Sequence, residues 1–118
     1  MTSALIHFVE SPGFTNRVDK LASLDVLFSI QNDLLRNPEL GALMAGCGGA
    51  RKGRVGSKAS ARGKSGGFRY IYIYIEIAEV IYLLHFYGKN EKADLSMAEK
   101  NELAKMIKEL KRLYGEKS

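Results

Sequence analysis

The sequence predicts an α+β fold, in which a small, largely antiparallel sheet of about four strands carries two helices from the N-terminal half of the chain and one C-terminal helix. Two observations support this fold class: two strand-like stretches between residues 68 and 87, and a helical apolar pattern over residues 24–35. Near the C-terminus, Ser96 and Glu99 form a capping box that opens a helix. Its apolar stripe is Leu103, Met106, Ile107 and Leu110. At 118 residues, we expect one domain over 1–118.

The N-terminal third of the chain predicts a strand followed by two helices. The apolar run Leu5–Val9 is the expected strand, because a Ser-Pro-Gly turn sequence follows it. A short helix is expected over Phe14–Leu21, and Ser23 caps a longer one that Pro38 ends. The apolar residues of this second helix recur at helical spacing: Leu24, Leu27, Ile30, Leu34 and Leu35.

The second half of the chain predicts three strands. A short strand is expected near Lys52–Ser57, and a flexible loop over Lys58–Gly67. Along Phe68–Ile77 the tyrosines and isoleucines alternate, so the tyrosines at 70, 72 and 74 point to one face and the isoleucines to the other. Val80–Tyr87 is the second strand of an antiparallel hairpin, because the break between the two runs is tight.

The positive charge of the chain is concentrated in one glycine-rich segment. Nine of the twelve glycines lie between Gly41 and Gly67, and no acid occurs between Glu39 and Glu76. The rest of the chain carries 11 cations against 13 acids, so this segment produces the net charge of +5. Such a distribution favours a polyanionic partner, with a solvated basic loop as the alternative.

Several other motifs are better explained by a structural role than by a catalytic or ligand-binding one. Gly63-Lys64-Ser65 lacks the leading glycine of a phosphate loop and precedes a strand. His7 and His85 lie in apolar strands without further ligands at suitable spacing, so we interpret them as core or surface residues and expect no metal or other cofactor. We interpret the tyrosine row as packing under a helix, with stacking on bases as the alternative.

The number of cysteines and the distribution of apolar residues indicate the cellular compartment in which the protein is expected. Cys47 is the only cysteine, so neither an intrachain disulfide nor a thiolate-rich zinc site is expected. Residues 1–10 do not resemble a signal peptide, which favours the reducing cytoplasm. The apolar stretch Tyr70–Tyr87 is interrupted by Glu76 and Glu79, so we expect strands there and no contact with a membrane.

Three cations are expected on one face of the sheet. Lys52 and Arg54 alternate along one strand, so their side chains point the same way, and Arg69 opens the adjacent strand. Like charges held together repel one another, and an anion that binds between them relieves the repulsion. The cluster therefore predicts a site for a phosphate-bearing polymer.

Five short motifs in unbroken order resemble a known toxin family. They are Asn37–Gly41, Gly46–Lys52, Gly63–Tyr72, Ile81–Leu84, and Tyr87–Glu91 followed by Asp94-Leu95-Ser96. Over about Gln31 to Leu110 the sequence resembles the HigB-type branch of the RelE/ParE superfamily. The resemblance implies a RelE-like microbial RNase-type fold.

The resemblance also implies a function. Family members are toxins of type II toxin–antitoxin systems, ribosome-dependent messenger-RNA endonucleases that inhibit translation and are held inactive by a cognate antitoxin, often a helix-turn-helix protein of the HigA kind. Lys52, Arg54 and Arg69 match positions of catalytic cations, and Lys89 matches a further basic position. The implied partners are the antitoxin, the ribosome and messenger RNA. The residues expected to bind RNA are Arg51, Lys58, Arg62, Lys64 and Asn90.

The sequence departs from the family pattern at several positions. Asn90 stands where RelE has an arginine, the final helix region lacks RelE's tyrosine, and Gly53 and Ala50 replace larger apolar residues. These departures leave the general acid unassigned, and Tyr87 is the candidate for it. Two alternatives follow: a ParE-like inhibitor of DNA gyrase, which the cationic cluster argues against, and an RNA-binding module without catalysis.

Metal-independent cleavage of RNA requires a base for the 2′-hydroxyl, charge compensation at phosphorus and a proton for the leaving 5′-oxygen. Arg54 and Arg69 can clamp the phosphate, since guanidinium groups bind its oxygens in a bidentate manner. Lys52 or Lys89 could act as the base if crowding favours a neutral amine. A ribosome that holds the message in line for attack would supply much of the remaining rate.

Overall fold

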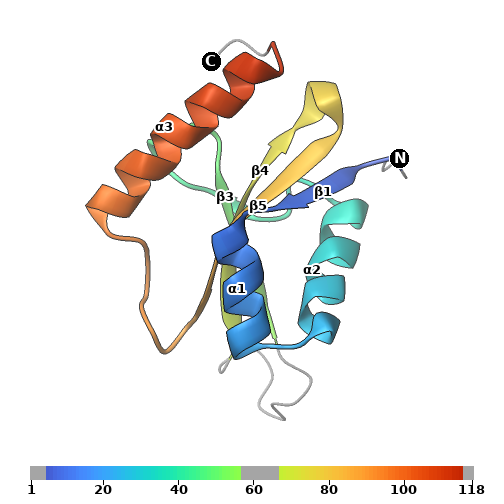
Figure 1. Ribbon diagram of the computed structural model, residues 1–118, viewed down its shortest axis with the longest axis vertical. Helices are drawn as coiled ribbons and strands as arrows, with labels where there is room; N and C mark the ends of the chain where they lie inside the picture. Colours follow the sequence, from blue (N-terminus) through green and yellow to red (C-terminus); the bar gives the residue numbers. More distant parts are fainter. Residues whose placement is uncertain (1–4, 57–66, 116–118) are drawn as a thin grey trace.

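The computed structural model describes residues 5–56 and 67–115 of the chain. In chain order its elements are β1 (His7–Glu10), α1 (Pro12–Leu21), α2 (Leu24–Arg36), β2 (Ala42–Leu43), β3 (Arg51–Val55), β4 (Phe68–Ile75), the 3-10 turn η2 (Glu76–Ala78), β5 (Val80–Gly88) and α3 (Met97–Leu113). The strands form one sheet in the order β1-β5-β4-β3-β2. Helices α1 and α2 cover one face of this sheet, and α3 covers the other (Figure 1).

The predicted α+β class is confirmed, with one more strand than expected and one parallel pair. Strand β1 runs parallel to β5, from His7 opposite Val80 to Glu10 opposite Leu83, whereas the other three pairings are antiparallel. The additional strand, β2, has only two residues, and both of its side chains are exposed. Its short length leaves no periodic pattern from which a strand could be predicted.

Local chemistry explains where the first two helices begin and end. The Ser11 hydroxyl accepts a hydrogen bond from the Phe14 amide at 3.0 Å, and Pro12 occupies the first helical position of α1. These two residues start the helix two positions earlier than its apolar pattern indicates. Helix α2 ends at Arg36, as expected from Pro38, which disfavours helical geometry in the residue before it.

The hairpin of β4 and β5 forms the centre of the sheet. The first strand ends at Ile75, two residues before the predicted end, because the chain enters a 3-10 turn and Glu79 then adopts a left-handed φ of 54°. A β-bulge between Ile71 and Tyr72 changes the register, so that Ile71 faces His85 while Tyr72 faces Leu83.

Alternation along β4 divides the hydrophobic core into two layers. Tyr70 and Tyr72 are fully buried in the core layer between the sheet and helices α1 and α2. The alternating isoleucines are buried in the layer between the sheet and α3: Ile71, Ile73 and Ile75. The Tyr72 hydroxyl donates to the Pro38 carbonyl at 2.8 Å and accepts from the Gly41 amide at 2.9 Å. The packing interpretation is therefore confirmed for these two tyrosines, since buried rings are not available to bases.

Gly53 on β3 leaves the space that the ring of Tyr70 occupies. The two residues face each other across β3 and β4, and a Cβ atom on Gly53 would lie 2.5 Å from Oη and 2.8 Å from Cε1 of Tyr70. The ring of Tyr70 thus occupies the volume that a side chain at position 53 would need. The glycine at position 53 therefore has a packing explanation in this chain.

The C-terminal helix begins at the predicted capping box, in which Ser96 accepts from the Glu99 amide and the Glu99 carboxylate accepts from the Ser96 amide. Three details of the helix predictions are wrong. Met106 and Leu24 lie in their predicted apolar stripes but are 42% and 61% exposed. Ser23 is the N-cap residue of α2, as predicted, but its side chain, contrary to expectation, makes no capping hydrogen bond. Within residues 5–56 and 67–115, the helices are too short or too polar to cross a membrane.

Candidate functional site

The register of β3, β4 and β5 brings two arginines and a tyrosine into one line across the sheet. Arg54 faces Arg69, and Arg69 faces Tyr87 on its other side, so the three side chains share the face that α3 covers. We call this line the Arg54 row. Opposed residues of an antiparallel pair have Cα atoms only about 4.5–5.5 Å apart, so the two guanidinium groups start from adjacent backbone positions.

Neither arginine of this row is neutralised by a described acid. The ion pairs between described residues do not include Arg54 or Arg69. Arg54 is exposed and Arg69 is half-buried, and Nη1 of Arg69 makes a weak bond to the Phe68 carbonyl at 3.4 Å. Like charges directly opposite one another destabilise a sheet, and a phosphate group seated between them would reverse the sign of that contribution.

A second line lies one step further along the same face. Lys52 faces Ile71, which faces His85, and we call this line the Lys52 row. The Lys52 ammonium group is 3.2 Å from Oδ1 of Asp94, and the other carboxylate oxygen of Asp94 is 3.0 Å from Nζ of Lys100. Asp94 therefore ties β3 to the first turn of α3.

The pKa of Asp94 reflects these contacts. Hydrogen bonds from Lys100, from the Leu95 amide and from Lys52 lower the pKa of Asp94 to about 2. The carboxylate consequently stays charged throughout the physiological range, and Lys52 forms the cationic half of an ion pair.

Tyr87 closes the Arg54 row with an unusual hydroxyl group. The residue is 2% exposed, and its Oη has no hydrogen-bond partner among the described residues. Burial raises the pKa of Tyr87, with a further contribution from Asp94, while Arg69 acts in the opposite direction. The ammonium group of Lys92 lies 5.3 Å from the ring centroid. The phenol thus keeps its proton at neutral pH and has a free hydrogen bond to donate.

The remaining predicted site residues lie apart from these two rows. Arg51 points to the opposite face of β3, where its guanidinium donates to the carbonyls of Glu39 and Gly41 at 3.1 and 2.8 Å. Lys89 and Asn90 are exposed in the turn after β5. Three residues expected to bind RNA lie outside the described residues: Lys58, Arg62 and Lys64.

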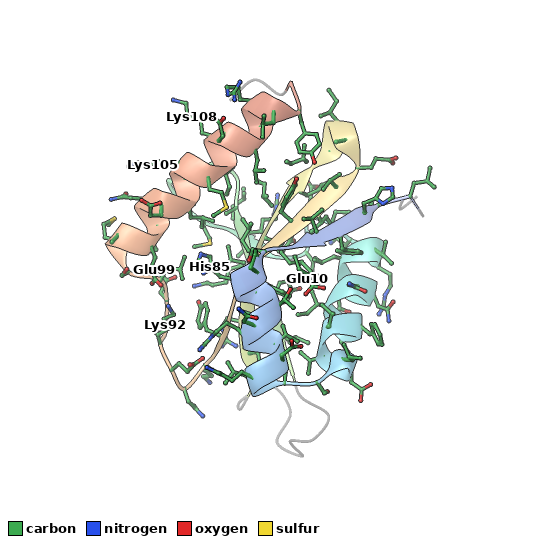
Figure 2. The ribbon with its side chains drawn as sticks, in the orientation of Figure 1. Glu10, His85, Lys92, Glu99, Lys105 and Lys108 are labelled. Atoms are coloured by element: carbon green, nitrogen blue, oxygen red, sulfur yellow. The ribbon has the colours of Figure 1, made fainter. Side chains whose placement is uncertain are left out.

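A pocket of about 490 Å³ opens beside the Lys52 row. It lies between α1, β5 and the segment that leads into α3, and Figure 2 shows His85, Lys92 and Glu99 close together there. The charged and aromatic side chains that line it are Arg17, His85, Phe86, Tyr87, Glu91, Lys92 and Glu99. Within the described ranges, no cluster of three or more His, Cys, Asp or Glu residues could hold a metal ion.

The contact between Asp94 and Lys52 has no local sequence signal, because it spans 42 residues of the chain. His85 is half-buried on β5, which agrees with its interpretation as a core or surface residue, and its spacing of two from Tyr87 places both on one face.

Comparison with known proteins bears on the fold. No family model matches the sequence. Among solved structures, the chain is similar to the toxin RelE of E. coli, determined in the free state as a double mutant with two arginines replaced by alanine. The TM-score is 0.60 at 16% sequence identity, and the match covers 90% of this chain and 97% of that chain. The protein therefore has a RelE-like α+β fold.

Proposed function

We propose that this protein is the toxin of a type II toxin–antitoxin pair, of the HigB-type branch, and that it cleaves messenger RNA on the ribosome. One observation carries the proposal: Arg54 and Arg69 face each other on a sheet face and are not neutralised by the described acids. The fold is that of a protein known as a toxin, which supports the same conclusion.

The two rows could supply two of the three requirements for metal-independent cleavage. Arg54 and Arg69 would bind the scissile phosphate and stabilise the additional negative charge that develops at phosphorus. Lys52 lies in the next row, where Asp94 offsets its charge, so the two arginines carry most of this role. Tyr87 would donate its proton to the leaving 5′-oxygen, because its unpartnered hydroxyl adjoins Arg69 in the register.

Inducible expression in bacteria tests this proposal. The expected result is growth arrest together with messages cut inside translated frames, and cleavage that depends on ribosomes. Arrest without cut messages would instead support a ParE-like inhibitor, and RNA binding without either effect would support a non-catalytic binding module.

We predict that binding to RNA or ribosomes depends strongly on salt. Each phosphate that a cation neutralises in single-stranded RNA contributes about −0.7 to the slope of log K against log salt, so three or four contacts give roughly −2 to −3. Filter-binding or fluorescence titrations between 50 and 200 mM salt, roughly the range in which such slopes are resolved, measure this value. A slope near zero would leave Arg54 and Arg69 without their proposed role.

We also predict that a cognate antitoxin, of the helix-turn-helix HigA kind, covers the two rows. An acidic segment that binds Lys52, Arg54 and Arg69 would make complex formation fast and sensitive to salt. An amphipathic helix docked on apolar surface would instead exclude the ribosome sterically with little salt dependence. Affinity measurements at low and high salt distinguish these routes, and failure of every neighbouring gene product to rescue growth would contradict the antitoxin prediction.

A further inference from the structure

His85 places a titratable ring on the sheet face that carries the proposed phosphate site, although neither arginine of that site lines the pocket beside His85. It stands in the Lys52 row, and Tyr87 follows it two residues along β5 on the same face. Two residues of a strand span about 6.6 Å, so the ring starts close to both Tyr87 and Arg69. The strand therefore places an imidazole and a buried phenol on the sheet face that carries the two arginines.

The surroundings of His85 leave its ring open to a ligand. The ring is half-buried, lines the pocket of about 490 Å³ and is not bound by any hydrogen bond between described residues. Tyr87 lines the same pocket with a buried hydroxyl that lacks a described partner. A pocket of this size accommodates a small ligand or part of a nucleotide.

Several charged groups face His85 from the elements packed around it. Glu99 belongs to α3, Lys92 to the segment before it, and Arg17 to α1, where it forms an ion pair with Glu91. Burial lowers the pKa of His85 from 6.5, while Glu99 acts to raise it and Lys92 to lower it. At neutral pH the ring is consequently uncharged and can accept a proton.

We propose that His85 is the general base of the RNA cleavage assigned above, a role that rests on that proposed function. Lys52 was a candidate for this role, but Asp94 holds it as one half of an ion pair, and Lys89 is exposed in the turn after β5. His85 is the described side chain of this face that combines an uncharged ring, an open pocket and proximity in the register to Tyr87.

The proposed reaction balances without a further reactant. The 2′-hydroxyl proton passes to the free ring nitrogen of His85, the 2′-oxygen bonds to phosphorus, and the bond from phosphorus to the 5′-oxygen breaks. Tyr87 protonates the leaving 5′-oxygen, and the products are a 2′,3′-cyclic phosphate and a free 5′-hydroxyl. Solvent then returns a proton to Tyr87 and removes the one on His85.

Message cleavage by the wild-type protein and by His85→Gln, measured with ribosomes from pH 5.5 to 8, tests the assignment. The range reaches from about one unit below the usual histidine pKa to about 1.5 units above it. The wild-type rate is expected to fall as the pH drops through the pKa of His85, because the protonated ring cannot act as base. His85→Gln is expected to lose about 10²–10⁴-fold in rate, together with this acid limb. His7→Gln, at an exposed position on β1, is the matched control and should keep both the rate and the profile.

Two charge-removing variants test the same ring without altering it. Glu99→Gln should move the acid limb to lower pH and Lys92→Gln to higher pH, since the two charges act on His85 in opposite directions. Glutamine at 99 retains an oxygen for the Ser96 amide, so the start of α3 is preserved. NMR titration of the His85 ring in the free protein should show the same two shifts, independently of catalysis.

The outcomes distinguish a failure of the proposed function from a failure of the role of His85. If the wild-type protein does not cut messages in any ribosome assay, the proposed function fails, and the role of His85 fails with it. If the wild type cuts and folded His85→Gln cuts at the same rate with the same acid limb, the role of His85 alone is overturned. Should His85→Gln not fold, acid limbs that fail to move in opposite directions in the other two variants overturn it equally.

Discussion

Replacing Arg69 with alanine is expected to abolish growth arrest and to lower message cleavage by about 10²–10³-fold, the loss seen when one group that stabilises transition-state charge is removed. Arg69 is the central member of the Arg54 row, between Arg54 and Tyr87, and is not neutralised by a described acid. Its side chain is half-buried and contributes little to the core, so the fold should remain intact. Growth curves, mapped cleavage ends and circular dichroism measure the three quantities.

Two further variants sharpen this prediction. Arg112→Ala removes an arginine that is exposed on α3 and paired with Glu109, so it changes the net charge equally but should leave cleavage unchanged. Arg69→Lys keeps the charge without the planar bidentate fork and should retain part of the activity. Normal cleavage by a folded Arg69→Ala protein would contradict the assignment of the Arg54 row as the phosphate site.

Replacing Gly53 with alanine is expected to lower the free energy of unfolding by about 1–3 kcal/mol, the usual cost of overfilling a packed core. The added Cβ would lie 2.5 Å from Oη and 2.8 Å from Cε1 of Tyr70, a fully buried ring that cannot turn aside without moving β4. Urea denaturation of both proteins measures the change, provided that the dependence of the unfolding free energy on urea concentration is the same for the two.

A double-mutant cycle identifies the cause of that loss. Gly53→Ala should cost less in a Tyr70→Leu background, because the shorter side chain leaves room for the Cβ, so the two changes should not be additive. Gly13→Ala is the matched control: a Cβ there meets nothing within 4 Å, and alanine in α1 should be neutral or stabilising. Equal costs in both backgrounds would show that Tyr70 is not the reason for the glycine.

Features that depend on neighbouring residues in the chain were predictable from the sequence. The alternation of tyrosines and isoleucines along β4 correctly predicted two faces, because successive strand side chains point to opposite sides of a sheet. The capping box at Ser96 and the helix end before Pro38 were predictable for the same reason, since each involves atoms within a turn of one another. The excess of cations between Glu39 and Glu76 is likewise a property of the sequence alone.

The candidate site was predictable only in part. Lys52 and Arg54 were expected on one face from their spacing of two, and Arg69 on a neighbouring strand. Their meeting with Tyr87 depends on the β3–β4–β5 register, which the bulge between Ile71 and Tyr72 shifts by one residue on β5. Periodicity does not determine register, because sliding a strand by two positions leaves every side chain on the same face.

By itself, the sequence determined the α+β class, the two faces of β4, the start of α3 and the concentration of positive charge before Phe68. Only the tertiary structure decided that β1 lies parallel to β5, that Asp94 reaches Lys52 across 42 residues, and that His85 stands in the Lys52 row. The physical reason is that helix caps, turns and side-chain alternation arise from contacts within a few residues, whereas strand order and ion pairs between distant segments depend on how the whole chain packs.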